Sequence, residues 1–122
     1  MTEQKQTFLR NIWYYALPGR QLKTGQMFAK QLLDEPVVFG RTNSGEVFAL
    51  RDICPHRAVP LSCGRFSGEE IECAYHGWRF DEAGQCKAIP ALNADQDLDL
   101  SKFQVRRYPV REVQGNIWIY MS

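Results

Sequence analysis

Two short motifs dominate the chain, and each contains one cysteine and one histidine. The first, C-P-H-R, begins at Cys54, and the second, C-A-Y-H-G-W, begins at Cys73. The chain has only two histidines, and both lie in these motifs. One sulfur ligand and one nitrogen ligand on each of two loops make a four-ligand metal site. We therefore expect Cys54, His56, Cys73 and His76 to bind one metal centre.

The composition of the chain is that of one globular domain, with 122 residues of which 44% are hydrophobic and 24% are charged. A formal net charge of +1 argues against binding to nucleic acid or to a membrane surface. Residues 1–6 are polar and no long apolar run follows, so we expect a cytoplasmic protein without a membrane segment. In that reducing compartment the four cysteines are expected to be metal ligands or thiols rather than disulfides.

Short apolar runs alternate with turn sequences along the chain, which predicts an all-β fold. The sequence T-N-S-G at 42–45 lies between two such runs and predicts a hairpin. Pro109 interrupts the apolar region near the C-terminus and favours a sheet edge or a bulge. The expected strands are 12–17, 37–39, 47–50, 71–73, 78–80, 86–89, 105–108, 110–113 and 116–120. No long amphipathic helix is predicted, and both motifs are expected at the tips of loops.

Two further features of the sequence have a functional and a structural interpretation. The irregular segment 91–104 is acidic around residues 95–99, and it is either a docking loop for a basic electron donor or a solvated connection. We favour the connection, because charged loops are usually solvated. Cys63 and Cys86 are either a redox pair or extra ligands, or else small buried thiols. We favour buried thiols.

The spacing of the four ligands distinguishes an iron–sulfur site from a zinc site. Zinc fingers pair cysteine with cysteine and histidine with histidine along the chain. Here the order is C-x-H followed by C-x-x-H, so unlike ligands stand together on each loop. Such a set can divide a two-iron cluster, with cysteines on one iron and histidines on the other. The sequence favours the iron–sulfur cluster over zinc or a chance arrangement of core residues.

With these two motifs, the chain resembles a Rieske [2Fe–2S] domain. More narrowly, it is similar to the N-terminal domain of the large (alpha) subunit of Rieske non-haem iron oxygenases, which hydroxylate rings or remove O-methyl groups. The resemblance extends beyond the motifs to N-I-W-Y at 11–14, E-P-V-V at 35–38 and G-N-I-W at 115–118. It implies an antiparallel β-sandwich or barrel, with residues 1–122 forming a single Rieske domain. It also implies a small cluster-binding subdomain of two metal-bearing loops at about residues 52–90.

The resemblance implies that Cys54 and Cys73 bind one iron and that His56 and His76 bind the other. An oxidised cluster with two thiolates and two neutral imidazoles carries no net charge. One added electron leaves a negative charge beside the imidazoles, which favours their protonated form. We therefore expect the reduction potential to fall as the pH rises.

Two aromatic residues refine the expected potential. Respiratory Rieske proteins have hydroxyl donors at the positions that Trp78 and Phe80 occupy here, and neither side chain has a hydroxyl group. Fewer donors stabilise the reduced cluster less, so the resemblance implies a potential near the low end of the Rieske range, about −150 mV.

The resemblance also implies a role in electron transfer and a set of partners. A reductase or ferredoxin would supply the electron, and a mononuclear iron in the protein's own catalytic domain or in a neighbouring subunit would receive it. That iron needs two further histidines and a carboxylate, and this chain has no further histidine. A catalytic domain acting on an aromatic or related organic substrate is therefore expected after Ser122. The alternative is a complete Rieske ferredoxin that carries electrons on its own.

Overall fold

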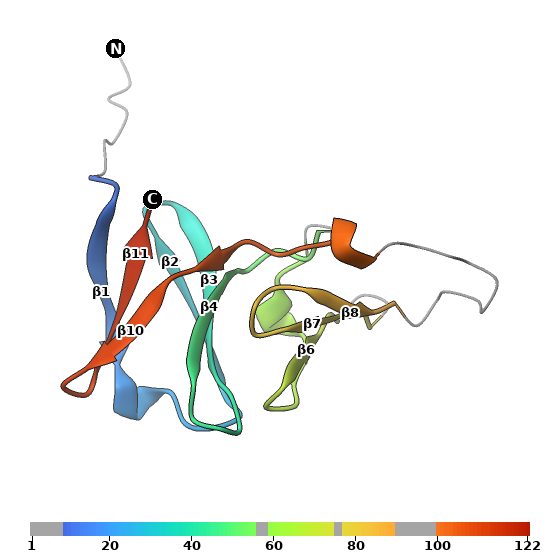
Figure 1. Cartoon of the computed structure of the whole chain (residues 1–122), viewed down its shortest axis with the longest axis horizontal. Helices are drawn as coiled ribbons and strands as arrows, with labels where there is room; N and C mark the ends of the chain where they lie inside the picture. Colours follow the sequence, from blue (N-terminus) through green and yellow to red (C-terminus); the bar gives the residue numbers. More distant parts are fainter. Residues whose placement is uncertain (1–8, 56–58, 75–76, 90–99) are drawn as a thin grey trace, which may run out of the picture.

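The computed structural model describes residues 9–55, 59–74, 77–89 and 100–122. Within these ranges it contains eleven strands in three sheets and three short 3₁₀ helices (Figure 1). All strand pairs in these sheets are antiparallel, which confirms the predicted all-β fold. The part of the chain that the structure describes has no helix long and apolar enough to cross a membrane.

Sheet A joins the two ends of the chain and has the strand order β1-β11-β10. Its central strand is β11, the last of the described strands, and the turn Gln114-Gly115 precedes it, between the predicted strands 110–113 and 116–120. Both turn residues have positive φ, 51° and 77°, which matches the right-handed twist of a two-residue hairpin. The strands are β1 (Ile12–Pro18), β10 (Val110–Val113) and β11 (Asn116–Met121).

Sheet B has the order β2-β3-β4-β9 and forms the middle of the molecule. The predicted hairpin at 42–45 joins β3 to β4, and Gly45 adopts the positive φ of 91° that such a turn needs. Strand β2 was not predicted. The strands are β2 (Met27–Leu32), β3 (Glu35–Arg41), β4 (Val47–Arg51) and β9 (Arg107–Tyr108), and helix η1 (Gly19–Gln21) precedes β2.

Pro109 lies where the chain passes from one sheet to the other. Strand β9 ends sheet B at Tyr108, and β10 begins the edge of sheet A at Val110. A proline fits here because it cannot donate a backbone hydrogen bond, while its carbonyl still accepts one from the Tyr120 N–H at 2.9 Å. The expectation of a sheet edge at Pro109 is confirmed.

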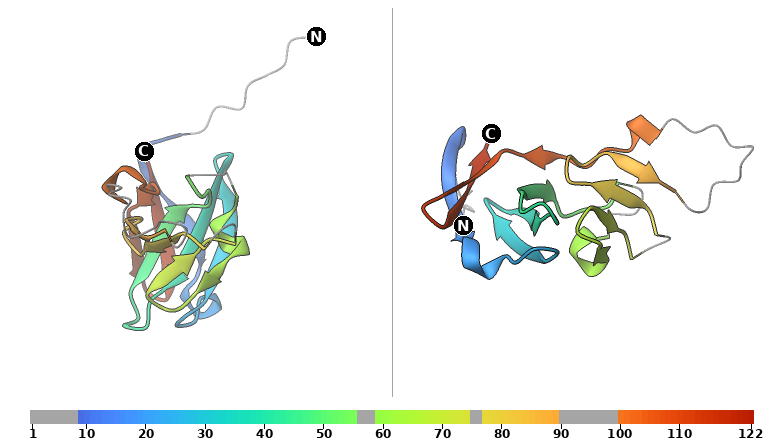
Figure 2. Two further views of the ribbon diagram at one scale, coloured as in Figure 1. Left: turned by 90° about the vertical axis from the view of Figure 1, so that its right-hand side faces the viewer. Right: turned by 60° about the horizontal axis from the view of Figure 1, so that its bottom comes forward.

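Sheet C has the order β5-β6-β7-β8 and lies at the end of the molecule away from sheet A (Figure 1). Figure 2 shows the same separation from a second direction, with the strands of sheet B between the two. A turn closed by the hydrogen bond from the Gly84 N–H to the Asp81 carbonyl joins β7 to β8. The elements are η2 (Leu61–Cys63), β5 (Arg65–Phe66), β6 (Glu70–Glu72), β7 (Arg79–Asp81), β8 (Cys86–Ala88) and η3 (Leu100–Lys102).

Two buried cores share strands β3 and β4 as a common wall. Side chains alternate along a strand, so neighbouring residues face opposite sides of the sheet. Phe39 and Ala49 pack into the core between sheets A and B. Val38, Phe48 and Leu50 pack into the second core, beneath sheet C. Because both faces of these strands are buried, their sequences are continuously apolar rather than alternating.

Candidate metal centre

Cys54 and Cys73 each lie at the start of a loop that follows a strand. Two residues separate Cys54 from β4, and Cys73 follows β6 directly. The exposed fractions of the two residues are 0% and 2%, and both belong to the core beneath sheet C. The structure therefore brings the two predicted sulfur ligands into one buried cluster.

The two loops are closed by equivalent backbone hydrogen bonds. The backbone N–H of Cys54 donates to the carbonyl of Val59 at 2.7 Å, and that of Cys73 donates to the carbonyl of Trp78 at 2.6 Å. Each bond joins a cysteine to the residue five positions further on, so each loop encloses four residues. One of the four is a histidine in both cases. Gly77 assists the second closure with φ of 68°, and its N–H donates to the Cys73 carbonyl at 3.1 Å.

The two predicted nitrogen ligands, His56 and His76, lie outside the described residues. Within the described ranges no three His, Cys, Asp or Glu side chains group as a metal site. The acidic segment around residues 95–99 also lies outside them. What the structure does describe fits a cluster with mixed ligands, because two buried thiols on matched loops are a donor set that iron–sulfur clusters use.

Asp52 holds the base of the first loop. Its carboxylate accepts hydrogen bonds from the Ser62 backbone N–H at 2.7 Å and from the Ser62 hydroxyl at 2.6 Å. The Asp52 N–H in turn donates to the Pro36 carbonyl at 2.9 Å. Asp52 is 5% exposed, so these are interior bonds that tie the loop both to η2 and to sheet B. No role was predicted for Asp52 from the sequence, because its partner Ser62 is ten residues away.

Gly64 allows the segment after η2 to pack closely on the start of the second loop. A Cβ atom on Gly64 would lie 1.9 Å from the carbonyl oxygen of Glu72 and 3.2 Å from the N of Ala74, the residues on either side of Cys73. Its φ of −90° is open to any residue. Glycine is therefore required by the close approach of the two backbones and not by the backbone conformation.

The aromatic residues after the second motif form part of the wall around the cysteines. Phe80 is fully buried in the same core. Trp78 packs against that core and meets Phe103 edge to face, with ring centroids 5.1 Å apart. Trp78 therefore packs at the edge of the core that contains both cysteines.

The other two cysteines have different surroundings. Cys86 is buried, as expected, and burial raises the pKa of its thiol. The expectation of a buried thiol was wrong for Cys63, which is exposed at the end of η2. A hollow of about 460 Å³ opens beside Cys63 and reaches Cys73 and Gly77. Among the described residues, which include all four cysteines, there is no disulfide.

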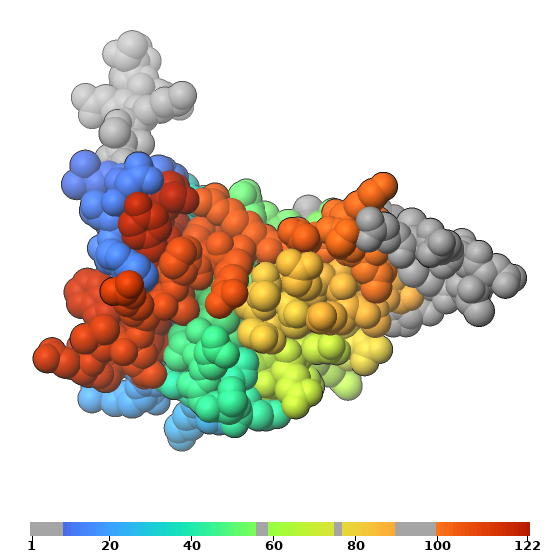
Figure 3. Space-filling model, viewed as in Figure 1, coloured from blue at the N-terminus to red at the C-terminus, as the bar shows by residue number. Residues whose placement is uncertain are grey.

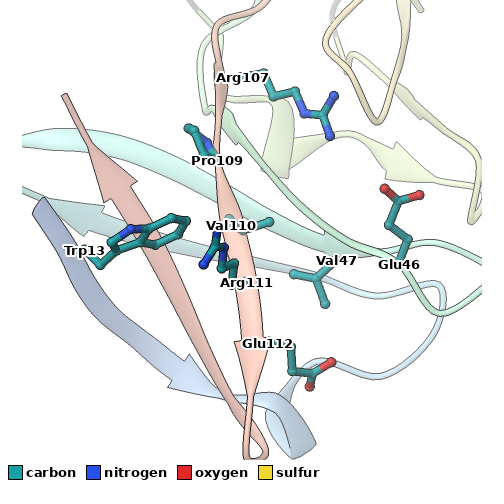
Figure 4. Close-up of a pocket in the computed structure, with 8 residues that line it drawn as sticks. All are labelled: Trp13, Glu46, Val47, Arg107, Pro109, Val110, Arg111 and Glu112. Carbon is teal, nitrogen blue, oxygen red and sulfur yellow. The ribbon is translucent and has the colours of Figure 1, made fainter. Parts of the chain in front are cut away.

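A second hollow lies away from the cysteines, between strands β10 and β4. It has a volume of about 560 Å³ and is bordered by Trp13, Val47 and Arg107 (Figure 4). Figure 4 shows the side chains of Trp13 and Arg111 together on one side of β10. This hollow is not part of the metal centre.

Comparison with protein families matches residues 12–109 to the Rieske [2Fe–2S] domain. The chain belongs to this family. Rieske domains carry a [2Fe–2S] cluster, and the buried Cys54 and Cys73 lie within the matched residues. The match therefore favours an iron–sulfur cluster over zinc.

Several of the similar proteins are oxygenases or oxygenase components. The iron–sulfur subunit of the toluene-4-sulfonate monooxygenase system of Comamonas testosteroni is 38% identical over 115 residues, which are 94% of this chain and 32% of that protein. The crystal structure of dicamba monooxygenase matches with a TM-score of 0.85 and 38% identity over 96% of this chain and 35% of that chain. The carbazole-bound oxygenase and ferredoxin complex of carbazole 1,9a-dioxygenase matches with a TM-score of 0.81 and 28% identity, over 92% of this chain and 29% of that chain. The chain thus spans about a third of the length of each of these three relatives.

Proposed function

We propose that this Rieske domain transfers electrons as the N-terminal domain of a non-haem iron oxygenase, with Cys54, His56, Cys73 and His76 as the cluster ligands. The observation that supports this most directly is the matched closure of the two cysteine loops in one buried core. Both loops contain a histidine within the closed segment. A mixed thiolate and imidazole set is the one that Rieske clusters use.

When bound, a [2Fe–2S] cluster accepts and releases single electrons. The residues of this chain would keep water and other reactants away from the two sulfur ligands, since Phe80 and Trp78 pack around them. The hydrogen bonds between Asp52 and Ser62 would hold the first loop in place as the charge of the site changes.

The oxygenase activity itself belongs to a catalytic domain that we place after Ser122. A mononuclear iron site of the two-histidine, one-carboxylate kind needs histidines that this chain does not have. The relatives named above have about two thirds of their length outside the matched region, which leaves room for such a domain. We propose that residues 1–122 form the single Rieske domain, with a cluster-binding part at about 52–90. We propose an aromatic or related organic substrate for the whole protein.

The partners follow from the same proposal. A reductase or ferredoxin in the cytoplasm would reduce the cluster, and one relative of known structure is an oxygenase in complex with a ferredoxin. The acceptor would be the mononuclear iron of the same polypeptide or of a neighbouring subunit. A complete Rieske ferredoxin is the second candidate. A natural gene product of roughly 300 residues or more would support the oxygenase, and a product that ends near Ser122 would support the ferredoxin.

The ligand set is tested by replacing one histidine and one cysteine that is not a predicted ligand. We expect the purified protein to be red-brown and to show a rhombic EPR signal after reduction. His76→Ala should abolish the signal, and Cys63→Ser should keep it, because Cys63 is exposed and outside the motifs. Stoichiometric zinc in a colourless protein, or an unchanged signal in His76→Ala, would refute the assignment.

A further inference from the structure

The outward face of sheet A is covered with aromatic side chains. Trp13 lies directly opposite Tyr120, and Tyr15 lies opposite Trp118. Both pairs meet edge to face, with ring centroids 5.5 Å and 5.7 Å apart. The exposed fractions are 37% for Trp13, 45% for Tyr15 and 36% for Trp118. The outward face of such a sheet is normally polar when it meets water, so this face has the composition of a covered surface.

Strand β10 extends this face with one cation and one apolar residue. Arg111 lies opposite Trp118, and its guanidinium group is 5.1 Å from the centroid of the Trp13 ring. Val113 is 50% exposed, and a hollow of about 320 Å³ is bordered by Trp13, Trp118, Arg111 and Val113. We call the six residues the aromatic face: Trp13, Tyr15, Arg111, Val113, Trp118 and Tyr120. Tryptophan, tyrosine and arginine are the residues that protein interfaces favour.

The position of the aromatic face separates it from the two cysteine loops. Sheet A lies at one end of the molecule and sheet C at the other (Figures 1 and 2). Cys54 and Cys73 belong to the core beneath sheet C and not to the core beneath sheet A. In the space-filling view the first and last strands form one continuous surface at this end, and the segments of sheet C lie away from it (Figure 3). A donor that bound here would be remote from the cysteines.

We propose that the aromatic face is the docking surface for the catalytic domain of the same polypeptide. This inference rests on the proposed function. Strand β11 is the central strand of sheet A and ends at Met121, so a continuing chain leaves from the middle of the sheet. Its departure point is held by Arg10, which donates to the Ser122 carbonyl at 3.3 Å, and by Arg106, which donates to the Ser122 hydroxyl at 2.9 Å. A covalently attached domain that starts here has a high effective concentration at the face.

Charge also favours the catalytic domain over a second copy of this chain. All six residues of the aromatic face are described, and Arg111 is the one charged residue among them. An identical face would therefore supply no carboxylate to Arg111 and would place two guanidinium groups in one interface. The occupant is expected to present an apolar side chain to the 320 Å³ hollow and a carboxylate to Arg111.

The test uses the full-length natural protein and hydroxyl-radical footprinting read by mass spectrometry. We expect Trp13, Tyr15 and Trp118 to be oxidised about tenfold more slowly than in peptides of the same sequence, at protein concentrations where the molecule is a single polypeptide. Oxidation of these three residues at the rate of the peptides would show that they are exposed and would overturn the proposal. Protection that appears only when the protein self-associates would assign the face to a second copy of the chain. A natural gene product that ends at Ser122 would have no catalytic domain to dock and would overturn the proposal.

Two variants of the full-length protein test the docking itself. Arg111→Glu and Trp118→Ser should each increase protease cleavage after Ser122 about tenfold, because an undocked domain exposes its connection. Lys23→Ser, which changes an exposed residue away from the face, should cleave at the original rate. The reduced EPR signal per polypeptide should stay unchanged in all three, which shows that the Rieske domain is folded. Unchanged cleavage in both face variants would overturn the proposal. A full-length protein that bound no mononuclear iron would refute the proposed function instead.

Discussion

The carboxylate of Asp52 accepts two hydrogen bonds from Ser62, from its backbone N–H at 2.7 Å and from its hydroxyl at 2.6 Å. Asp52 is buried two residues before Cys54, and Ser62 is the middle residue of η2. The pair therefore bridges the start of the first cysteine loop and the helix that follows it.

Replacing Asp52 should loosen the first loop. Asp52→Ala removes both acceptors from Ser62 and should lower the free energy of unfolding by about 1–3 kcal/mol. Asp52→Asn should cost less, because its amide oxygen can still accept the Ser62 N–H. Urea unfolding measures the loss, and Glu69→Ala, which changes an exposed carboxylate on a turn, is the matched control. Equal unfolding midpoints for Asp52→Ala and Glu69→Ala would contradict this role.

Adding one methyl group at Gly64 should push the segment after η2 away from the start of the second loop. In Gly64→Ala the new Cβ would lie 1.9 Å from the Glu72 carbonyl oxygen, so the backbone on one side must move. Overpacking of this kind costs about 1–3 kcal/mol. We expect a lower unfolding midpoint and a lower iron content per chain after purification.

Gly25→Ala separates the steric effect at Gly64 from a conformational one. Gly25 has a φ of 78°, and a Cβ added there would meet no atom within 4 Å, so alanine is strained only by its backbone conformation. Gly25→Ala should lower stability but keep the iron content. Equal loss of iron in the two variants would argue against the packing of Gly64 on the second loop.

The ion pair between Arg41 and Glu112 should make stability depend on pH in the acid range. Two hydrogen bonds, at 2.9 Å and 2.8 Å, join the two side chains. These bonds from Arg41 outweigh burial and lower the pKa of Glu112 below its usual range. The stabilisation is complete above the unfolded-state pKa of about 4.3 and is lost as the pH falls through the lower folded-state value. Unfolding of Glu112→Gln should be measured between about pH 2 and pH 6, the range that this pKa sets. Its free energy of unfolding should fall less steeply with decreasing pH than that of the unchanged protein.

The native protein should have one fast-reacting thiol. Cys63 is exposed, whereas Cys86 is buried and its pKa is raised by that burial, so it holds little of the reactive thiolate. With the cluster bound, Cys54 and Cys73 are expected to be protected as ligands. Alkylation followed by peptide mass spectrometry should modify Cys63 first, and Cys63→Ser should remove the fast phase without loss of the EPR signal. Fast labelling of Cys86 would contradict the buried position.

Local sequence was enough to predict the elements that depend on local chemistry. The hairpin at 42–45 follows from Gly45, which adopts positive φ without a steric cost. The turn before β8 follows from Asp81, whose carboxylate accepts hydrogen bonds from the N–H groups of Ala83 and Gln85. Cys54 and Cys73 were predicted as ligands for a similar reason, because each motif places its cysteine and histidine within a few residues.

Features set by distant packing were not predictable in this way. The hairpin between β2 and β3 turns through Leu33 and Asp34, with φ of 49° and 62°, although neither is the asparagine or glycine that usually signals such a turn. Strand pairing imposes that conformation, so β2 was missed. The requirement for glycine at Gly64 depends on a carbonyl eight residues away. Cys63 was expected inside because cysteine is usually buried, but its position at the end of η2 turns it outward.

Strands β3 and β4 have a consequence for how the cofactor affects the rest of the molecule. Each strand contributes alternate side chains to both cores, as with Phe39 on one side and Val38 on the other. Unfolding of either core therefore disrupts the two strands that the other core needs. The domain is expected to unfold in a single cooperative step. Whatever binds tightly at the cysteine loops stabilises only the folded state. Incorporation of the cluster should therefore raise the melting temperature of sheet A, at the opposite end of the molecule, as much as that of the loops themselves.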